Sequence, residues 1–204
     1  GYTERSMRIS ATGPNPHPNT TTDWTRDPAW FEVGRIAWGD IEMAEDQRTL
    51  LAMNLYNRNL YLIDITTGNV LSKYPIPGIT GGPAWGVPLS TSSPDRDLRP
   101  FGLGVRGDTA YVGIVDSAES TQLQSDLFGY VFEFDIPSGT FNTTPVLSFP
   151  INGAADPFVD QVLSPGRAYG PWSNTTAAPN QYVGHHAPAV SDISFVGNDM
   201  LVSI

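Results

Sequence analysis

The chain has 204 residues, no cysteine and a net charge of −10 at pH 7. The missing cysteines exclude disulfide scaffolds, thiolate metal sites and cysteine nucleophiles. The 11 Lys and Arg residues are scattered, which argues against nucleic acid as a partner. No apolar run approaches the roughly 20 residues that span a bilayer, so we expect no membrane insertion. A content of 20 Gly and 18 Pro, with 16% charged residues, favours an all-β, loop-rich fold.

The first segment, residues 1–32, is polar and is interrupted by Pro14, Pro16, Pro18 and Pro28. Proline fixes φ and cannot donate a backbone hydrogen bond, so we expect an extended arm or a long loop here. The remaining residues, 33–204, carry the folded part of the chain.

A unit of four short strands joined by turns is predicted over about residues 39–77. A related unit follows over about 99–151, and a third begins near 190 and stops inside a strand at Ile204. Units of this kind are typical of β-propeller blades, and about four blades are needed to close a ring. We therefore expect a partial β-propeller. The sequence favours an excerpt of a longer protein, and the alternative is a ring that another chain completes.

The strands of these units predict a core and almost no helix. Both faces are apolar in residues 60–63 and 130–134, as expected for a blade packed between two others. Ile63 and Phe132 should therefore be buried. Asp64 and Asp135 each precede an Ile and a turn, which favours a role in turn initiation.

Two further proline-rich segments, residues 78–98 and 152–189, are long for loops inside a compact domain, and loops of this length are often functional. They carry aromatic residues, which favours ordered loops. We predict that four of these form a contact surface for a partner chain or a glycan: Trp85, Tyr169, Trp172 and Tyr182. The alternative is that they simply cover the ends of the blades.

Two acidic residues, Asp40 and Asp192, occupy the same position in their units, one residue before an Ile, whereas Gly102 stands near that position in the second unit. Inner strands of propellers line the central channel, so these carboxylates could form a ring that binds Ca²⁺ or a cationic ligand. Alternatively, each Asp caps a turn or accepts backbone N–H groups between blades, with Arg99 as a candidate salt-bridge partner.

Other candidate sites have weaker signals. Neighbours on an extended chain point in opposite directions, so at most one of His185 and His186 could join Asp192 in a metal site, and we assign no metal ligand. No Gly-x-Ser-x-Gly elbow is present, and Glu42 and similar acids are common at strand edges, so we assign no catalytic residue. Three Asn-x-Thr sequons occur, about as many as chance gives, at Asn19, Asn142 and Asn174.

The order of several motifs resembles a group of bacterial secreted or cell-surface β-propeller proteins, which are often linked to SdrD-like B-repeat or immunoglobulin-like modules. The resemblance covers about residues 33–204, and it rests on these strings: residues 39–42, 54–64, 99–103, 111–113 and 190–195. It implies an extracellular or cell-surface location and a binding or structural role. It supplies no catalytic motif that could be assigned to residues of this chain.

These observations predict a non-catalytic structural or adhesive surface module that contacts a protein or a glycan through its long loops, or self-assembles through blade edges. The alternative is a propeller enzyme, such as a metal-dependent lactonase or a glycan-cleaving enzyme, with its site at the channel mouth. An enzyme would require several acidic or His groups to converge there, whereas an adhesive module uses loops and edges.

Overall fold

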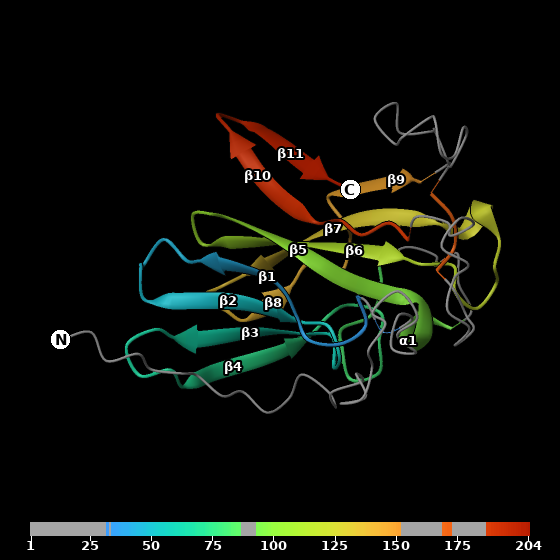
Figure 1. Ribbon diagram of the computed structural model, residues 1–204. Coiled ribbons are helices and arrows are strands. Elements are labelled where there is room, and N and C mark those ends of the chain that lie inside the picture. The colour runs from blue at the N-terminus through green and yellow to red at the C-terminus, as the bar shows by residue number, and fades with distance from the viewer. Residues whose placement is uncertain (1–31, 33, 87–92, 152–168, 173–186) are drawn as a thin grey trace, which may run out of the picture.

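The computed structural model describes residues 32, 34–86, 93–151, 169–172 and 187–204. These residues form antiparallel β-sheets with very little helix (Figure 1). Their helical elements are short, namely α1 (Pro94–Asp97) and the 3-10 helix η3 (Gln124–Asp126). The expected all-β class is therefore confirmed. Among the described helices, none has the length and apolar character that crossing a bilayer requires.

Sheet 1 contains four strands in chain order, and each pairs with the next in antiparallel fashion: β1 (Trp38–Met43), β2 (Thr49–Asn54), β3 (Asn59–Asp64) and β4 (Val70–Pro75). The sheet lies where the sequence predicts a unit of four short strands, over about residues 39–77. The turn after β3 is built as predicted, because Asp64 Oδ1 accepts the N–H groups of Thr66 at 2.9 Å and Thr67 at 2.8 Å.

Sheet 2 repeats this order with five strands: β5 (Leu98–Arg106), β6 (Thr109–Asp116), β7 (Phe128–Asp135), β8 (Thr140–Phe141) and β9 (Leu147–Pro150). Both β8 and β9 pair with β7, so the expected fourth strand is split. At the split, the side chain of Asn142 accepts the N–H of Thr144. Pro145 follows and has no N–H to give to the sheet.

Sheet 3 is an antiparallel hairpin of β10 (Asp192–Val196) and β11 (Asp199–Ser203). The first strands of the three sheets lie next to one another, with β5 between β1 and β10 (Figure 1). The sheets therefore repeat side by side along the chain. The described residues do not close into a ring.

Two apolar cores hold the sheets together. The first lies between sheets 1 and 2 and includes Leu51, Leu60 and Phe132, and the second lies between sheets 2 and 3 and includes Val131 and Ile193. A smaller cluster of Ala52, Tyr61 and Ile63 lies on the other face of sheet 1. Phe132 and Ile63 are both buried, as the sequence predicts.

Candidate functional site

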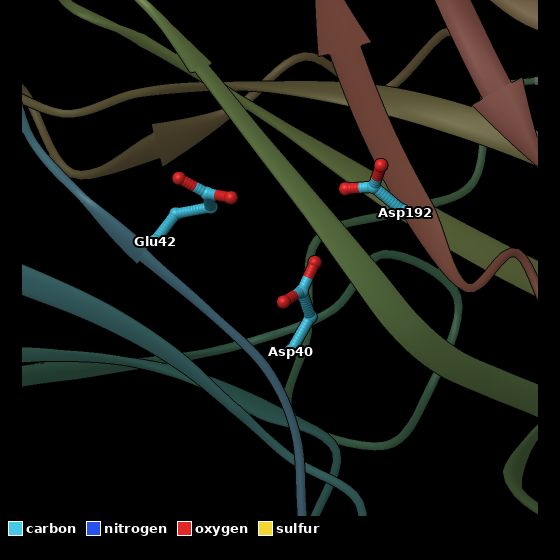
Figure 2. Close-up of side chains that lie close together, drawn as sticks. All are labelled: Asp40, Glu42 and Asp192. Atoms are coloured by element: carbon cyan, nitrogen blue, oxygen red, sulfur yellow. The ribbon is translucent and has the colours of Figure 1, made fainter.

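Three carboxylates gather where the first strands of the sheets meet. Asp40 and Glu42 come from β1 and Asp192 comes from β10, and Figure 2 shows that β5 passes between the two strands. One oxygen of each carboxylate lies within 4.8 Å of the others. Asp40 and Asp192 were predicted to share a position, whereas Glu42 was assigned to an ordinary strand edge. Its position two residues after Asp40 was the available signal, because alternate residues of a strand share a face.

Asp40 also joins two sheets. Its Oδ2 accepts the backbone N–H of Leu103 on β5 at 2.9 Å, and its Oδ1 accepts the N–H of Ile41 at 2.8 Å. This is the backbone-bonding arrangement that the sequence left open as the alternative to a carboxylate ring. The same carboxylate also belongs to the acidic cluster, so the predicted carboxylate ring stays a prediction.

Gly102 occupies the corresponding position on β5 because no side chain fits there. A Cβ atom on Gly102 would lie 2.6 Å from the carbonyl oxygen of Val190 and 2.8 Å from the nitrogen of Asp192. The Gly102 N–H donates to the Val190 carbonyl at 2.7 Å, which fixes this close approach of the two chains. At this position, sheet 2 therefore contributes the backbone of Gly102, whereas sheets 1 and 3 contribute aspartate side chains.

Electrostatics raise the pKa of Glu42 above its usual value. The largest cause is partial burial, followed by repulsion from the Asp40 and Asp192 carboxylates, and a hydrogen bond to the backbone of Met43 opposes them. Such a cluster can share a proton or accept a cation. An all-oxygen donor set is the kind that Ca²⁺ prefers. Acidic groups also gather without an ion, so the calcium site stays a prediction.

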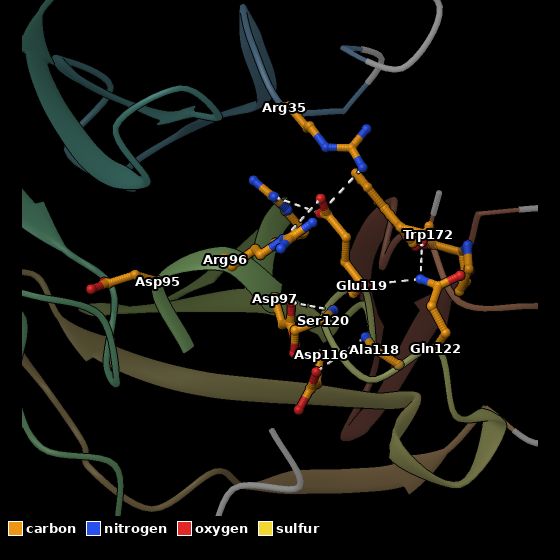
Figure 3. A network of polar contacts seen from close by, with 12 residues as sticks. Arg35, Asp95, Arg96, Asp97, Asp116, Ala118, Glu119, Ser120, Gln122 and Trp172 are labelled. Carbon is orange, nitrogen blue, oxygen red and sulfur yellow. Dashed lines mark hydrogen bonds and ion pairs between the residues drawn. The ribbon is translucent and has the colours of Figure 1, made fainter. Parts of the chain in front are cut away.

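Arg99 does not pair with these acids, so its predicted role as their salt-bridge partner is wrong. Its guanidinium instead binds Glu119, with an Nη2–Oε2 distance of 2.8 Å. Arg35 approaches the same oxygen at 3.2 Å, and Arg96 reaches the other oxygen at 3.4 Å (Figure 3). Burial alone would raise the pKa of Glu119, but Arg99 and Arg35 outweigh it and hold the pKa below its usual value.

Trp172, which lies outside the strands, contacts the residues of this network. Its indole N–H donates to the Pro188 carbonyl at 2.9 Å, and its ring centroid lies 5.2 Å from the guanidinium carbon of Arg35. Its backbone N–H donates to the Ser117 carbonyl. Its own carbonyl accepts from the Gln122 side chain (Figure 3). Trp172 is buried, so its ring is part of the interior rather than an exposed contact.

The other predicted contact residues differ in position. Trp85 is partly buried and packs edge-on against Tyr130, with ring centroids 5.0 Å apart. Tyr169 is partly buried, and its hydroxyl donates to the Ile204 carbonyl at 3.3 Å. Tyr182 lies outside the described residues. The described contacts of Trp172 are therefore those of a residue that covers the sheets, whereas Trp85 keeps part of its surface exposed.

Of the remaining candidate residues from the sequence, the structure describes Asn142. Asn142 is exposed beside β8, and its side chain is engaged in the turn with Thr144. Asn19, Asn174, His185 and His186 lie outside the described residues. Sequence reasoning missed the Glu119 network, because its members are distant in sequence and share no periodicity.

Comparison with known proteins finds a similar curated sequence. The chain is 27% identical over 173 residues to Colossin-D of Dictyostelium discoideum. The aligned region covers 85% of this chain but 16% of the length of that protein. No protein family matches the chain, and no solved structure matches it.

Proposed function

We propose that this chain is a segment of a β-propeller that serves as a non-catalytic structural or adhesive module at the cell surface or outside the cell. The repetition of similar sheets around neighbouring first strands supports the propeller assignment. The proposed location rests on the resemblance to secreted bacterial propellers.

The observation that carries the proposal is that polar side chains of the described residues form hydrogen bonds between neighbouring sheets. Asp40 bonds sheet 1 to sheet 2 through Leu103. Glu45 accepts the N–H of Gly107, and Arg106 donates to Asn198, so the hairpin tips of adjacent sheets are also joined. These groups connect sheets, which is what a structural scaffold requires.

Contacts with a protein or a glycan are assigned to residues 78–98 and 152–189, with Trp85, Tyr169 and Tyr182 as the proposed aromatic residues. A glycan array probed with the full chain and with Trp85→Ala tests this assignment. We expect a glycan signal that falls at least tenfold in the variant while the circular dichroism spectrum is retained. An equal signal from both proteins, or no signal from either, would contradict a glycan contact at Trp85.

The acidic cluster favours a second candidate, a propeller enzyme with Asp40, Glu42 and Asp192 at the mouth of its channel. Turnover of lactones and aryl glycosides, measured with added Ca²⁺, Mg²⁺ or Zn²⁺, separates the two functions. The double variant Glu42→Gln/Asp192→Asn is the matched control, because it removes charge and keeps side-chain shape. The structural proposal expects no turnover above that control, and turnover that the double variant abolishes would replace it with the enzyme.

A further inference from the structure

Two buried arginine side chains of the described residues each carry a donor without an acceptor. The Nε atoms of Arg58 and Arg99 are buried and have no hydrogen-bond partner. Buried polar groups are normally paired, so an exception requires an explanation, such as a bound water or ion. A guanidinium carries a charge and can only donate hydrogen bonds, so the partner that fits both Nε–H groups is an acceptor.

The two arginines belong to the network around Glu119. Arg99, on β5, binds Glu119 with an Nη2–Oε2 distance of 2.8 Å. Arg58, in the turn between β2 and β3, donates through Nη1 to the carbonyl oxygen of Asp95. The next residue, Arg96, reaches Glu119 at 3.4 Å (Figure 3). A turn of sheet 1 and the start of sheet 2 therefore bring several guanidinium groups to the same end of the sheets.

The guanidinium groups of Arg58 and Arg99 lie close enough to influence each other. Burial is the main cause that lowers the pKa of Arg58, and repulsion from Arg99 lowers it further, whereas Asp95 and Glu119 act in the opposite direction. Burial is also the main cause that lowers the pKa of Arg99. Buried charges of like sign are unfavourable, and a shared counter-charge relieves both the burial and the repulsion.

The described carboxylates of this network are already engaged elsewhere. Glu119 is shared by three guanidinium groups. Asp95 accepts the backbone N–H and the hydroxyl of Thr80, and Asp97 accepts the same two groups of Ser120. These contacts leave the two Nε–H groups unpaired. An additional anionic acceptor would therefore complete the network.

We propose that this end of the sheets binds an oxyanion, namely a carboxylate, sulfate or phosphate group, through the Nε–H groups of Arg58 and Arg99. An oxyanion has several acceptor oxygens, and guanidinium groups bind such groups more strongly than they bind neutral acceptors. Solvent reaches the network at Arg96, whose side chain is 49% exposed. The site is independent of the proposed structural role of the sheets.

Thermal unfolding of the full chain tests the site, because a ligand that binds the folded state raises the melting temperature. The probes are sulfate, phosphate and acetate, each compared with potassium chloride of equal ionic strength. We expect at least one probe to raise the melting temperature more than chloride does, and calorimetric titration of that anion then gives its affinity. Equal melting temperatures in all four salts would overturn the proposal.

Arg58→Gln removes one donor group of the site and should weaken anion binding at least tenfold. The matched control is Arg48→Gln, which removes the same charge from a side chain that is 68% exposed and binds Asp64. Sulfate and phosphate also stabilise proteins because they are excluded from the protein surface. That effect is the same in both variants, so equal affinities of the two variants would contradict a site at Arg58.

A second measurement uses the wild-type chain and does not depend on how a variant folds. In nitrogen–proton correlation spectra, the titrated anion should shift the Nε–H signals of Arg58 and Arg99. The Nε–H signal of Arg48 should stay in place, because that group is already bonded to Asp64 at 3.0 Å. Unchanged signals of Arg58 and Arg99 would overturn the proposal even if the melting temperature rises.

The oxyanion can be a free ion or the acidic group of a sugar, and titrations with glucuronate and glucose distinguish these sources. Binding of glucuronate but not of glucose supports the site and identifies an acidic sugar as its ligand. Binding of sulfate or phosphate without glucuronate supports the site and identifies a free ion. Failure of all the anions to bind overturns the site and leaves the proposed structural role as it stands.

Discussion

At the scale of single residues, Glu42 and Glu119 lie in opposite electrostatic environments. Glu42 is partly buried and lies close to two other carboxylates, so its ionised form is disfavoured. Glu119 is contacted by three guanidinium groups, so its ionised form is favoured despite burial. The two residues therefore contribute to the pH dependence of stability with opposite signs.

Glu42→Gln should stabilise the protein at neutral pH. The folded-state pKa of Glu42 is raised, so its contribution is most favourable at low pH and is lost as pH rises through that value. The gain at pH 7 should be below about 1 kcal/mol, because solvent screens a partly exposed carboxylate. Urea unfolding at pH 4 and pH 7 measures it, with Asp199→Asn, an exposed acid of sheet 3, as the control outside the cluster. A loss of stability at pH 7 would instead indicate that the carboxylate has a favourable partner, such as a cation.

Glu119→Gln should destabilise the protein by about 3 kcal/mol at pH 7, because it leaves buried guanidinium groups without a counter-charge. The folded-state pKa of Glu119 is lowered, so its contribution is present above the ordinary glutamate pKa and disappears as pH falls through the folded value. The difference between wild type and variant should therefore shrink on acidification. Denaturant unfolding from pH 7 to pH 3 measures this trend, and a constant difference would contradict it.

At the scale of elements, the strands and their turns follow from local sequence. The strand–turn–strand order predicted the units that contain β1–β4 and β5–β7, and Asp64 and Asp135 start turns as expected, because their side chains bond backbone groups only two or three residues away. The equivalent positions of Asp40 and Asp192 left their convergence open as one of two alternatives. The split of the fourth strand and the Glu119 network were not, because they depend on contacts between segments that share no local pattern.

Phe132→Ala on β7 should lower the free energy of unfolding by about 3 to 5 kcal/mol. Phe132 is fully buried between sheets 1 and 2, and its ring centroid lies 4.5 Å from that of Trp85. Truncation therefore leaves a cavity that two sheets line. Leu71→Ala on β4 is the control, because Leu71 is exposed and should cost less than about 1 kcal/mol. Equal effects of the two substitutions in chemical denaturation would contradict the assignment of the core.

At the scale of the whole molecule, the packing of one sheet on the next is set by glycine as much as by apolar side chains. Gly102, Gly104 and Gly113 of sheet 2 all face segments at the start of sheet 3 at distances that no side chain allows. The sequence shows these glycines but not their purpose, because close approach of two backbones is a property of the assembled sheets. Their positions explain why sheet 3 lies directly against β5 and β6.

Gly104→Ala should loosen sheet 3 without disturbing sheet 1. A Cβ atom at Gly104 would lie 2.4 Å from the carbonyl oxygen of Ile193, and backbone on β10 cannot move aside without separating the sheets. Overpacking of this kind costs about 1 to 3 kcal/mol. Hydrogen exchange should become faster for amides of β10 and β11 and stay unchanged for those of β2 and β3. Ser194→Ala, an exposed substitution on β10, is the control. Faster exchange in all three sheets would mean that the molecule unfolds as one unit, whereas unchanged exchange in sheet 3 would mean that the close approach does not hold it in place.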